Sequence, residues 1–285
     1  MPSLAKHQSN SFTKLLLLGD AKSGKTTSLV SLVEAGYKLR ILDMDNLLDP
    51  LKEAILKRCP DKLENVEFRT LRDKYKTGSL GPVIDGAPKA FVQATKMIDH
   101  WKYTEDEVET DLGRPDGWGP DCILILDSLS RFCDAAYDFR EPLTKVGSSG
   151  EKDGRATYGD AQDAVESTLA HLTSKSFRTN VIVICHGQYM DLPDGKKIFP
   201  QGVGQKLSPK IPQYFPTYVR IKNLAGKRTI ELKSNALIDL AFPKPDALHD
   251  LSTDDGLAKI FATLRETTAT VAKPQAVTLR RANTK

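Results

Sequence analysis

Cysteine pairs, metal-binding clusters and long hydrophobic runs are all missing from this sequence of 285 residues. The four cysteines, Cys59, Cys122, Cys133 and Cys185, are scattered without Cys-x-x-Cys spacing. This pattern predicts reduced thiols in the core and argues against a disulfide framework or a zinc site. No apolar run approaches the roughly 20 residues that cross a bilayer, so we expect no membrane partner.

Residues 1–11 are polar, have no hydrophobic signal-peptide core and predict a flexible N-terminal tail. Residues 266–285 carry four basic side chains against the single acid Glu266, which predicts a flexible basic tail. We expect residues 12–265 to form one domain and the protein to stay in the cytoplasm. The net charge of +4 is mild, so it permits a nucleic-acid partner without arguing for one.

Short apolar runs alternate with helical segments along the chain. The expected strands are 14–19, 39–43, 66–71, 122–126 and 181–185, and the expected helices are 25–35, 51–58, 90–101 and 160–176. An antiparallel pair, 218–221 with 229–233, follows near the C-terminus. This order predicts the α/β class, with a doubly wound, mostly parallel sheet and an antiparallel extension. Residues 104–120, 141–158 and 191–212 are too long for plain connections, so we interpret them as elaborations.

The connection between the first strand and the first helix is a complete phosphate-binding loop. Its predicted nucleotide-binding residues are Gly19, Asp20, Ala21, Lys22, Ser23, Gly24, Lys25, Thr26 and Thr27. In such a loop the glycines let the backbone N–H groups approach the phosphates, the lysine reaches the β- and γ-phosphates, and the hydroxyl ligates Mg²⁺. The sequence therefore predicts a nucleoside triphosphate and Mg²⁺ as cofactors, with Lys25 and Thr26 in the two last roles.

Asp127 ends the most apolar strand, which is the expected place for the acid that holds Mg²⁺. The next residue is Ser128, where a typical AAA+ protein has its catalytic glutamate, so the base must come from elsewhere. The sequence has no Asn-Lys-x-Asp signature, which favours ATP over GTP, and no Gly-x-Ser-x-Gly elbow that would suggest an acyl hydrolase.

The segment Ile-Leu-Asp-Met-Asp-Asn-Leu-Leu-Asp-Pro at 41–50 resembles the end of the second core strand in RecA recombinases, and Asp127-Ser128 resembles their Walker-B ending. The resemblance runs loosely from about Phe12 to Lys233 and implies a RecA-like core. In that family the second acid of the segment polarises the attacking water, which implies that Asp45 is catalytic, with Asp43 as the alternative. RecA has the longer glutamate at this position.

Residues 181–188 resemble the RecA strand that ends in a sensor of the γ-phosphate, so His186 or Gln188 is implied to contact ATP. The loop that follows holds single-stranded DNA in RecA-like proteins. The DNA-binding residues implied for this chain are Lys196, Lys197, Lys206 and Lys210. The aromatic residues that could stack on bases are Phe199, Tyr214 and Phe215, and a second, weaker DNA segment surrounds Lys145, Lys152 and Arg155. Lys206 is also the candidate to reach the ATP of a neighbouring subunit.

After the Lys-rich loop the chain continues with Lys227-Arg228-Thr229-Ile230, Ala241-Phe242-Pro243 and Asp255-Gly256-Leu257. This ending and the compact core are similar to those of core-only RecA-like proteins of bacteriophages, which anneal single strands. This resemblance implies a DNA-stimulated, Mg²⁺-dependent ATPase that acts in recombination on single-stranded DNA, in the host cytoplasm if a phage encodes it. It also implies a homo-oligomer with ATP at subunit interfaces and a single-strand DNA-binding protein as a further partner. A ring-forming DNA motor or helicase of the same core, and an ATP-gated scaffold that binds protein partners, are the alternatives. Ring, filament and monomer all stay open.

Overall fold

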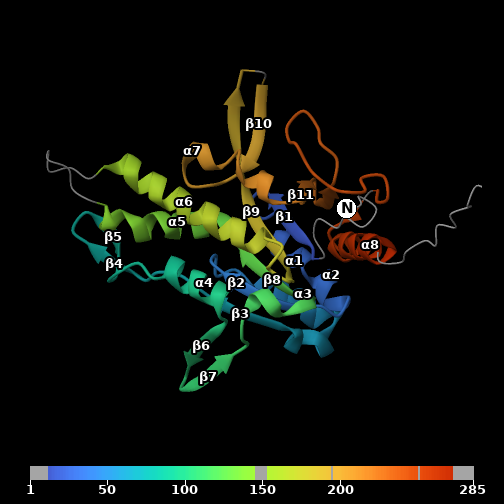
Figure 1. The fold of residues 1–285 in the computed structure, drawn as a ribbon, viewed down its shortest axis with the longest axis horizontal. Coiled ribbons are helices and arrows are strands. Elements are labelled where there is room, and N and C mark those ends of the chain that lie inside the picture. The colour runs from blue at the N-terminus through green and yellow to red at the C-terminus, as the bar shows by residue number, and fades with distance from the viewer. Residues whose placement is uncertain (1–11, 145–152, 194, 250, 272–285) are drawn as a thin grey trace, which may run out of the picture.

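A computed structural model of the chain describes residues 12–144, 153–193, 195–249 and 251–271 (Figure 1). The two expected tails therefore lie outside the described residues, except for positions 266–271, and so do Lys145 and Lys152. The strands of the main sheet are β1 Lys14–Gly19, β2 Lys38–Asp43, β3 Val66–Thr70, β8 Gly119–Asp127, β9 Thr179–Leu192, β10 Gly195–Pro200, β11 Thr217–Leu224, β12 Lys227–Glu231 and β13 Leu251–Ser252. The α-helices are α1 Lys25–Ser28, α2 Val30–Glu34, α3 Asp49–Arg58, α4 Ala90–Asp99, α5 Leu129–Arg140, α6 Gly154–Thr173, α7 Gly204–Leu207 and α8 Gly256–Val271. Short 3₁₀ helices at 60–65, 115–117, 141–143 and 211–214 complete the connections.

The main sheet has the order β13-β12-β11-β1-β9-β8-β2-β3, with β10 paired to β9 outside this path. Neighbours from β11 to β3 are parallel, whereas β11, β12 and β13 pair antiparallel. This arrangement confirms the expected α/β class with a doubly wound, mostly parallel sheet and an antiparallel extension near the C-terminus.

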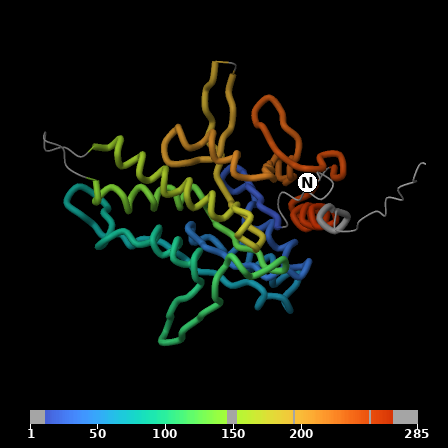
Figure 2. The backbone as a smooth tube through the Cα atoms, viewed as in Figure 1, coloured from blue at the N-terminus to red at the C-terminus, as the bar shows by residue number. Residues whose placement is uncertain are grey.

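Both faces of the sheet are covered, because side chains of a strand point alternately to opposite sides. In β1, Leu16 and Leu18 pack into a core with α4, α5 and α6, while Leu15 and Leu17 pack into a second core with α2, α3 and α8. All four leucines are fully buried. The result is a three-layer α/β/α arrangement, which the tube view also shows (Figure 2).

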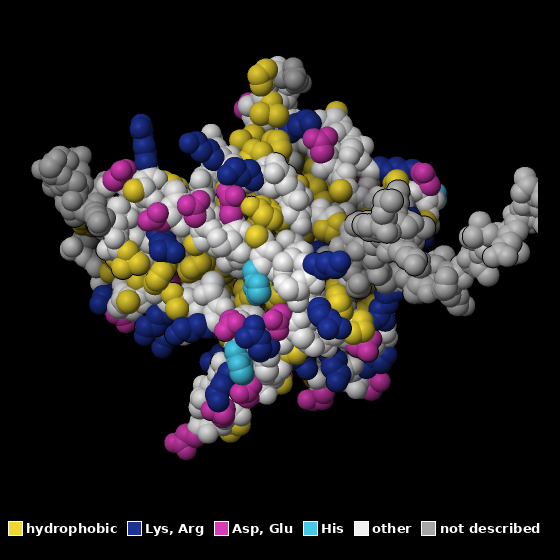
Figure 3. All heavy atoms as spheres, viewed as in Figure 1, with side chains coloured by type: hydrophobic (Ala, Val, Ile, Leu, Met, Phe, Trp, Pro, Cys, Tyr) yellow, Lys and Arg dark blue, Asp and Glu magenta, His cyan; other side chains and the backbone are white. Residues whose placement is uncertain are grey.

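Three hairpins project from this core. They are β4 Tyr75–Gly78 with β5 Gly81–Ile84, β6 Lys102–Glu105 with β7 Val108–Asp111, and the end of β9 with β10. The β6–β7 hairpin projects at the bottom of Figure 3 and carries acidic side chains toward its tip, while the β9–β10 hairpin projects at the top. The β6–β7 and β9–β10 hairpins overlap two of the segments interpreted as elaborations, 104–120 and 191–212. The sequence did not predict β4 and β5.

Several boundaries differ from the sequence predictions. The first helix is divided by Leu29 into α1 and α2, and α6 begins at Gly154 because the Asp153 carboxylate accepts hydrogen bonds from the N–H groups of Arg155 and Ala156. β9 continues to Leu192 because β10 supplies its hydrogen-bonding partner. At the other end of the chain, α8 continues to Val271, past the expected boundary at residue 265.

All four cysteines are buried and free of disulfides, as expected. Within the described ranges, no helix combines the length and the apolar character needed to cross a membrane.

Candidate nucleotide-binding site

A cavity of about 650 Å³ opens at the carboxyl edge of the parallel strands. Open α/β sheets bind their ligands at this edge. The strand register brings the relevant ends together, because Gly19 pairs with His186 and Asp127 pairs with Asp43. The cavity is lined by Ala21, Lys22, Gly24, Lys25, Thr26, Thr27, Asp45, Leu47, Pro50, Asp127, Ser130, Arg131, Asp134, His186, Gln201 and Arg228.

The loop between β1 and α1 forms one wall of this cavity. Gly24 has a φ of 98°, which glycine adopts without strain, and a side chain at Gly19 would lie 2.5 Å from the Ser23 hydroxyl. Gly19, Asp20 and Ser23 do not line the cavity, whereas the other predicted loop residues do. The Asp20 carboxylate instead lies 3.4 Å from the guanidinium of buried Arg220 on β11.

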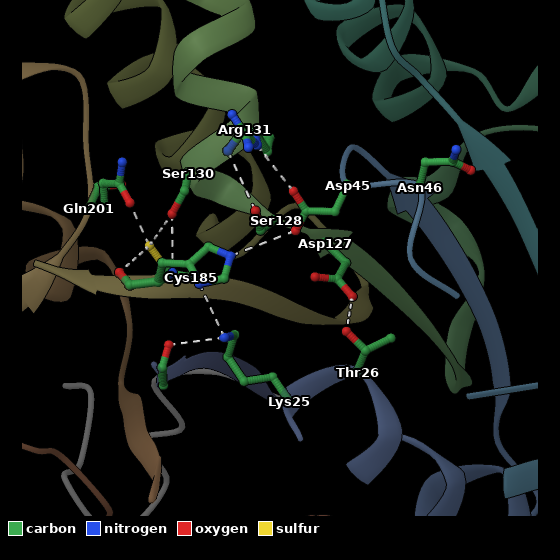
Figure 4. Close-up of polar contacts among 12 residues, drawn as sticks. Lys25, Thr26, Asp45, Asn46, Asp127, Ser128, Ser130, Arg131, Cys185 and Gln201 are labelled. Carbon is green, nitrogen blue, oxygen red and sulfur yellow. Dashed lines mark hydrogen bonds and ion pairs between the residues drawn. The ribbon is translucent and has the colours of Figure 1, made fainter. Parts of the chain in front are cut away.

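Lys25 lines the cavity, and Figure 4 shows its side chain pointing toward the imidazole beside Cys185. Its ammonium group donates hydrogen bonds of 2.9 Å to the carbonyl oxygens of Gly19 and Asp20 and lies 3.3 Å from Nδ1 of His186. Burial lowers the pKa of Lys25, and the nearby negative charge of Asp127 opposes this shift. The side chain therefore lies where a phosphate entering the loop would meet its charge.

Thr26 and Asp127 place two oxygen atoms side by side in the cavity. The Thr26 hydroxyl donates a 2.6 Å hydrogen bond to Oδ2 of Asp127. Burial raises the pKa of Asp127 to about 6; the hydrogen bond from Thr26 opposes this shift, and the negative charge of Asp45 adds to it. A hydroxyl and a buried carboxylate facing phosphate space fit Mg²⁺, which prefers oxygen ligands and is usually held by one or two carboxylates together with substrate phosphates.

Asp45 lies across the cavity from the loop and contacts two basic side chains. Its carboxylate is 3.5 Å from Nε of Arg131 and 3.8 Å from Nε2 of His186. Burial alone would raise its pKa, but hydrogen bonding with His186 and Ser128 and the charge of Arg131 outweigh this effect and lower the pKa. Asp45 is therefore ionised at neutral pH and able to accept a proton or orient water.

Asp43, the alternative base, is occupied by structural contacts. Its Oδ1 accepts hydrogen bonds from the N–H groups of Asp45 and Asn46, and its Oδ2 accepts one from the Thr70 hydroxyl. The side chain is 2% exposed and does not line the cavity. The geometry therefore separates the two acids: Asp43 fixes the turn that presents Asp45.

The two sensor candidates lie in different surroundings. His186 lines the cavity between Lys25 and Asp45. Gln188 lies farther along β9, where it pairs with Phe199 of β10, and its Oε1 accepts a hydrogen bond from the Ser208 hydroxyl. The structure thus brings His186, but not Gln188, to the predicted phosphate site.

Two arginines of the cavity were missed from the sequence. Arg131 lies in the first turn of α5 and pairs with Asp45 and Asp134. Arg228 comes from β12 and lies against Gly24. The sequence offers a signal for each. Arg131 lies at the start of the helix that follows Ser128, next to the end of the strand before it. Arg228 is a basic residue directly after the predicted hairpin turn.

The four lysines implied to bind DNA lie on or near the β9–β10 hairpin and α7, and three of them face carboxylates. Lys197 is 2.7 Å from Asp239, Lys210 is 2.8 Å from Glu166, and Lys196 is 3.8 Å from Asp191. Lys206 is exposed on α7. A DNA phosphate would therefore compete with a carboxylate for at least two of these ammonium groups.

The aromatic residues differ more from the expectation. Phe215 is 4% exposed inside the core, and Tyr214 is partly buried against the same core while its hydroxyl donates a hydrogen bond to Glu166. Tyr189 on β9 is instead 49% exposed, and Nζ of Lys196 lies 6.0 Å from its ring centroid. The prediction of Phe215 was wrong because its apolar ring packs against the sheet rather than remaining in the loop.

No curated protein matches the chain. One solved structure, described as a prototypical ATPase from the type III secretion system of pathogenic bacteria, is 12% identical with a TM-score of 0.43, and the match covers 74% of this chain. The chain spans about half of that protein's length, 52%. A family model described as an AAA domain matches residues 11–239, which is most of the chain, and the chain therefore belongs to this family of P-loop ATPases.

Proposed function

We propose that the protein is a Mg²⁺-dependent ATPase that acts on single-stranded DNA as a single-strand annealing recombinase, with ATP bound at the interfaces of a homo-oligomer. The observation that carries the proposal is the course of β9. This strand brings His186 to Lys25 and Asp45 and then continues directly into the projecting hairpin with Lys196. One continuous strand thus connects the nucleotide cavity with the surface proposed to hold DNA.

The roles within the cavity follow from its contacts. Phosphoryl transfer depends mainly on positioning and on neutralising charge. Lys25 supplies a positive charge at the loop, and Asp45, ionised and held by Arg131, orients the attacking water. Thr26 and Asp127 would hold Mg²⁺, which when bound neutralises negative charge on the β- and γ-phosphates.

His186 is proposed as the sensor. Its two ring nitrogens face Lys25 and Asp45, so a γ-phosphate that draws Lys25 toward itself removes one of the two contacts of the ring. Because His186 is the last residue of β9 that pairs with β1, such a change acts where the strand leaves the main sheet for the hairpin.

The test is to measure ATP hydrolysis with and without single-stranded DNA, together with annealing of complementary strands. The proposal predicts faster hydrolysis with DNA and faster annealing with ATP. Duplex unwinding instead of annealing would select the motor, and indifference to DNA in both assays would select the ATP-gated scaffold.

A further inference from the structure

Arg228 lies directly against the phosphate-binding loop. β11 runs parallel to β1, so the turn after Leu224 and the start of β12 lie at the same edge of the sheet as the loop. A Cβ placed on Gly24 would be 2.9 Å from Cδ and 3.2 Å from Nε of Arg228. The arginine stem therefore covers the glycine, and a side chain at position 24 would force the arginine to move.

The guanidinium of Arg228 has no protein partner within the part of the chain that the structure describes. No hydrogen bond or ion pair joins it to another described side chain or carbonyl, whereas Arg131 pairs with Asp45 and Arg58 forms an ion pair with Glu34. An arginine that borders a cavity with its charge unpaired is suited to bind an anion, and its planar fork matches a phosphate in particular.

Arg228 also lines a second cavity beside the first. The second cavity, of about 380 Å³, is lined by Gly24, Thr27, Ser28, Val30, Ala54, Lys57, Arg58, Arg228, Thr253 and Asp254. Gly24, Thr27 and Arg228 line both cavities, whereas Lys25, Thr26 and Asp127 line only the first. The two cavities therefore adjoin at Gly24, Thr27 and Arg228, and a ligand with its terminal phosphates at Lys25 that reached the second cavity would pass these residues.

We infer that the nucleotide spans both cavities, that Arg228 binds its phosphate chain where it passes from one to the other, and that the second cavity receives the ribose and base. This inference rests on the proposed function, binding of ATP at the loop. The second cavity suits a nucleoside, because Val30 and Ala54 supply apolar wall while Lys57, Thr253 and Asp254 supply polar groups.

The experiment compares binding of ATP and of inorganic tripolyphosphate, which has the phosphates without the nucleoside, by titration calorimetry. Arg228→Ala should weaken both ligands by roughly 10- to 100-fold, the loss expected for one hydrogen-bonded charge pair. Arg228→Lys should recover part of this loss. Lys227 is an exposed neighbour of Arg228 on the same hairpin, and it lines neither cavity. Lys227→Ala is therefore the control and should bind both ligands like the wild type.

The second cavity is tested by filling it. Ala54→Phe should weaken ATP while leaving tripolyphosphate binding unchanged, which also shows that the loop is intact. A photoactivated azido-adenine analogue of ATP gives the same information without a core substitution. It should label α3 near Lys57 or residues 253–254, and labelling confined to the wall at Leu47 and Pro50 would overturn the assignment of the second cavity.

The inference can fail separately from the proposed function. If the wild type binds ATP, and Lys25→Ala loses that binding, while Arg228→Ala binds both ligands like the wild type, the role of Arg228 is wrong and the loop assignment stands. If the wild type does not bind ATP at all, the proposed function itself is wrong.

Discussion

Asp43 and Asp45 lie two positions apart, yet their surroundings differ. Asp43 is buried under three hydrogen-bond donors, and burial raises its pKa even though the Thr70 hydroxyl opposes this. Asp45 faces the cavity and has a lowered pKa, because its partners His186 and Ser128 outweigh its burial. At the residue scale, therefore, the burial and partners of each carboxylate separate a structural acid from the proposed base.

Asp45→Asn should keep ATP binding but reduce turnover by roughly 100-fold, because an amide cannot accept a proton from water. Titration calorimetry and steady-state ATPase assays would measure the two effects. Asp43→Asn is the matched control: it should lower the unfolding temperature, since an uncharged amide oxygen accepts the two N–H bonds more weakly and the amide nitrogen cannot accept from the Thr70 hydroxyl. A larger loss of turnover in a stably folded Asp43→Asn than in Asp45→Asn would reverse the assignment.

Asp127 is expected to cost stability in exchange for function. Its pKa in the folded protein, about 6, lies above the ordinary value of 3.8, so the folded state holds this proton more tightly than the unfolded chain does. The resulting stabilisation is fully present below pH 3.8 and is lost as the pH rises through about 6. Above pH 6 the ionised carboxylate destabilises the protein that has neither nucleotide nor metal.

Asp127→Asn should therefore unfold at a higher temperature than the wild type in metal-free buffer at pH 7 to 8. Its free energy of unfolding should be larger by an amount on the order of 1 to 3 kcal/mol. This difference should shrink as the pH falls below 6, while ATP turnover is lost at every pH. Thermal unfolding of both proteins across this pH range checks the prediction. A variant less stable than the wild type at pH 8 would contradict it.

At the scale of elements, β9 determines how the site relates to the surface. Its first part lies between β1 and β8 in the main sheet, and its last part forms a hairpin with β10. Lys197 of this hairpin pairs at 2.7 Å with Asp239, which lies in the segment after β12, so binding a phosphate there requires the pair to open. Lys196 has a longer, 3.8 Å contact with the exposed carboxylate of Asp191 and lies 6.0 Å from the ring centroid of Tyr189, so it is the freer of the two.

Replacing Lys196 and Lys197 together with Ala should weaken binding of single-stranded DNA and lower the log–log salt slope by about 1.4, since each phosphate contact releases roughly 0.7 of a counterion. Affinities measured at several salt concentrations, with ATP and Mg²⁺ present, would show this. Asp239→Ala is the opposite control, because it frees Lys197 and should strengthen binding. An unchanged slope in the double variant would move DNA away from this hairpin and favour the scaffold.

Tyr189 illustrates what the sequence could and could not predict at this scale. The strand 181–185 was predicted from its apolar run, and it forms the buried part of β9. Its extension was not, because residues 187–192 are polar and mixed, and only pairing with β10 makes them a strand. An exposed aromatic residue was therefore expected in a loop at 199–215, whereas the hairpin presents it at Tyr189.

At the scale of the whole molecule, the alternation of apolar strands and helices was sufficient to predict a three-layer core. The phosphate-binding loop and Asp127 could also be predicted from the sequence, because each proposed role depends on residues adjacent in the chain to a buried strand. Arg131 and Arg228 were not, because their places depend on how α5 and the β11–β12 hairpin pack against that core. Long-range packing, rather than local pattern, completes the site.

The central claim is that the cavity at the loop between β1 and α1 binds and hydrolyses ATP. The most direct test is the ATP turnover and ATP affinity of the purified protein with Mg²⁺, measured beside Lys25→Ala. Loss of the charge at the β- and γ-phosphates should abolish turnover and greatly weaken binding, while the unfolding temperature stays within a few degrees of the wild type. Turnover and affinity equal to those of the wild type in Lys25→Ala would contradict the account.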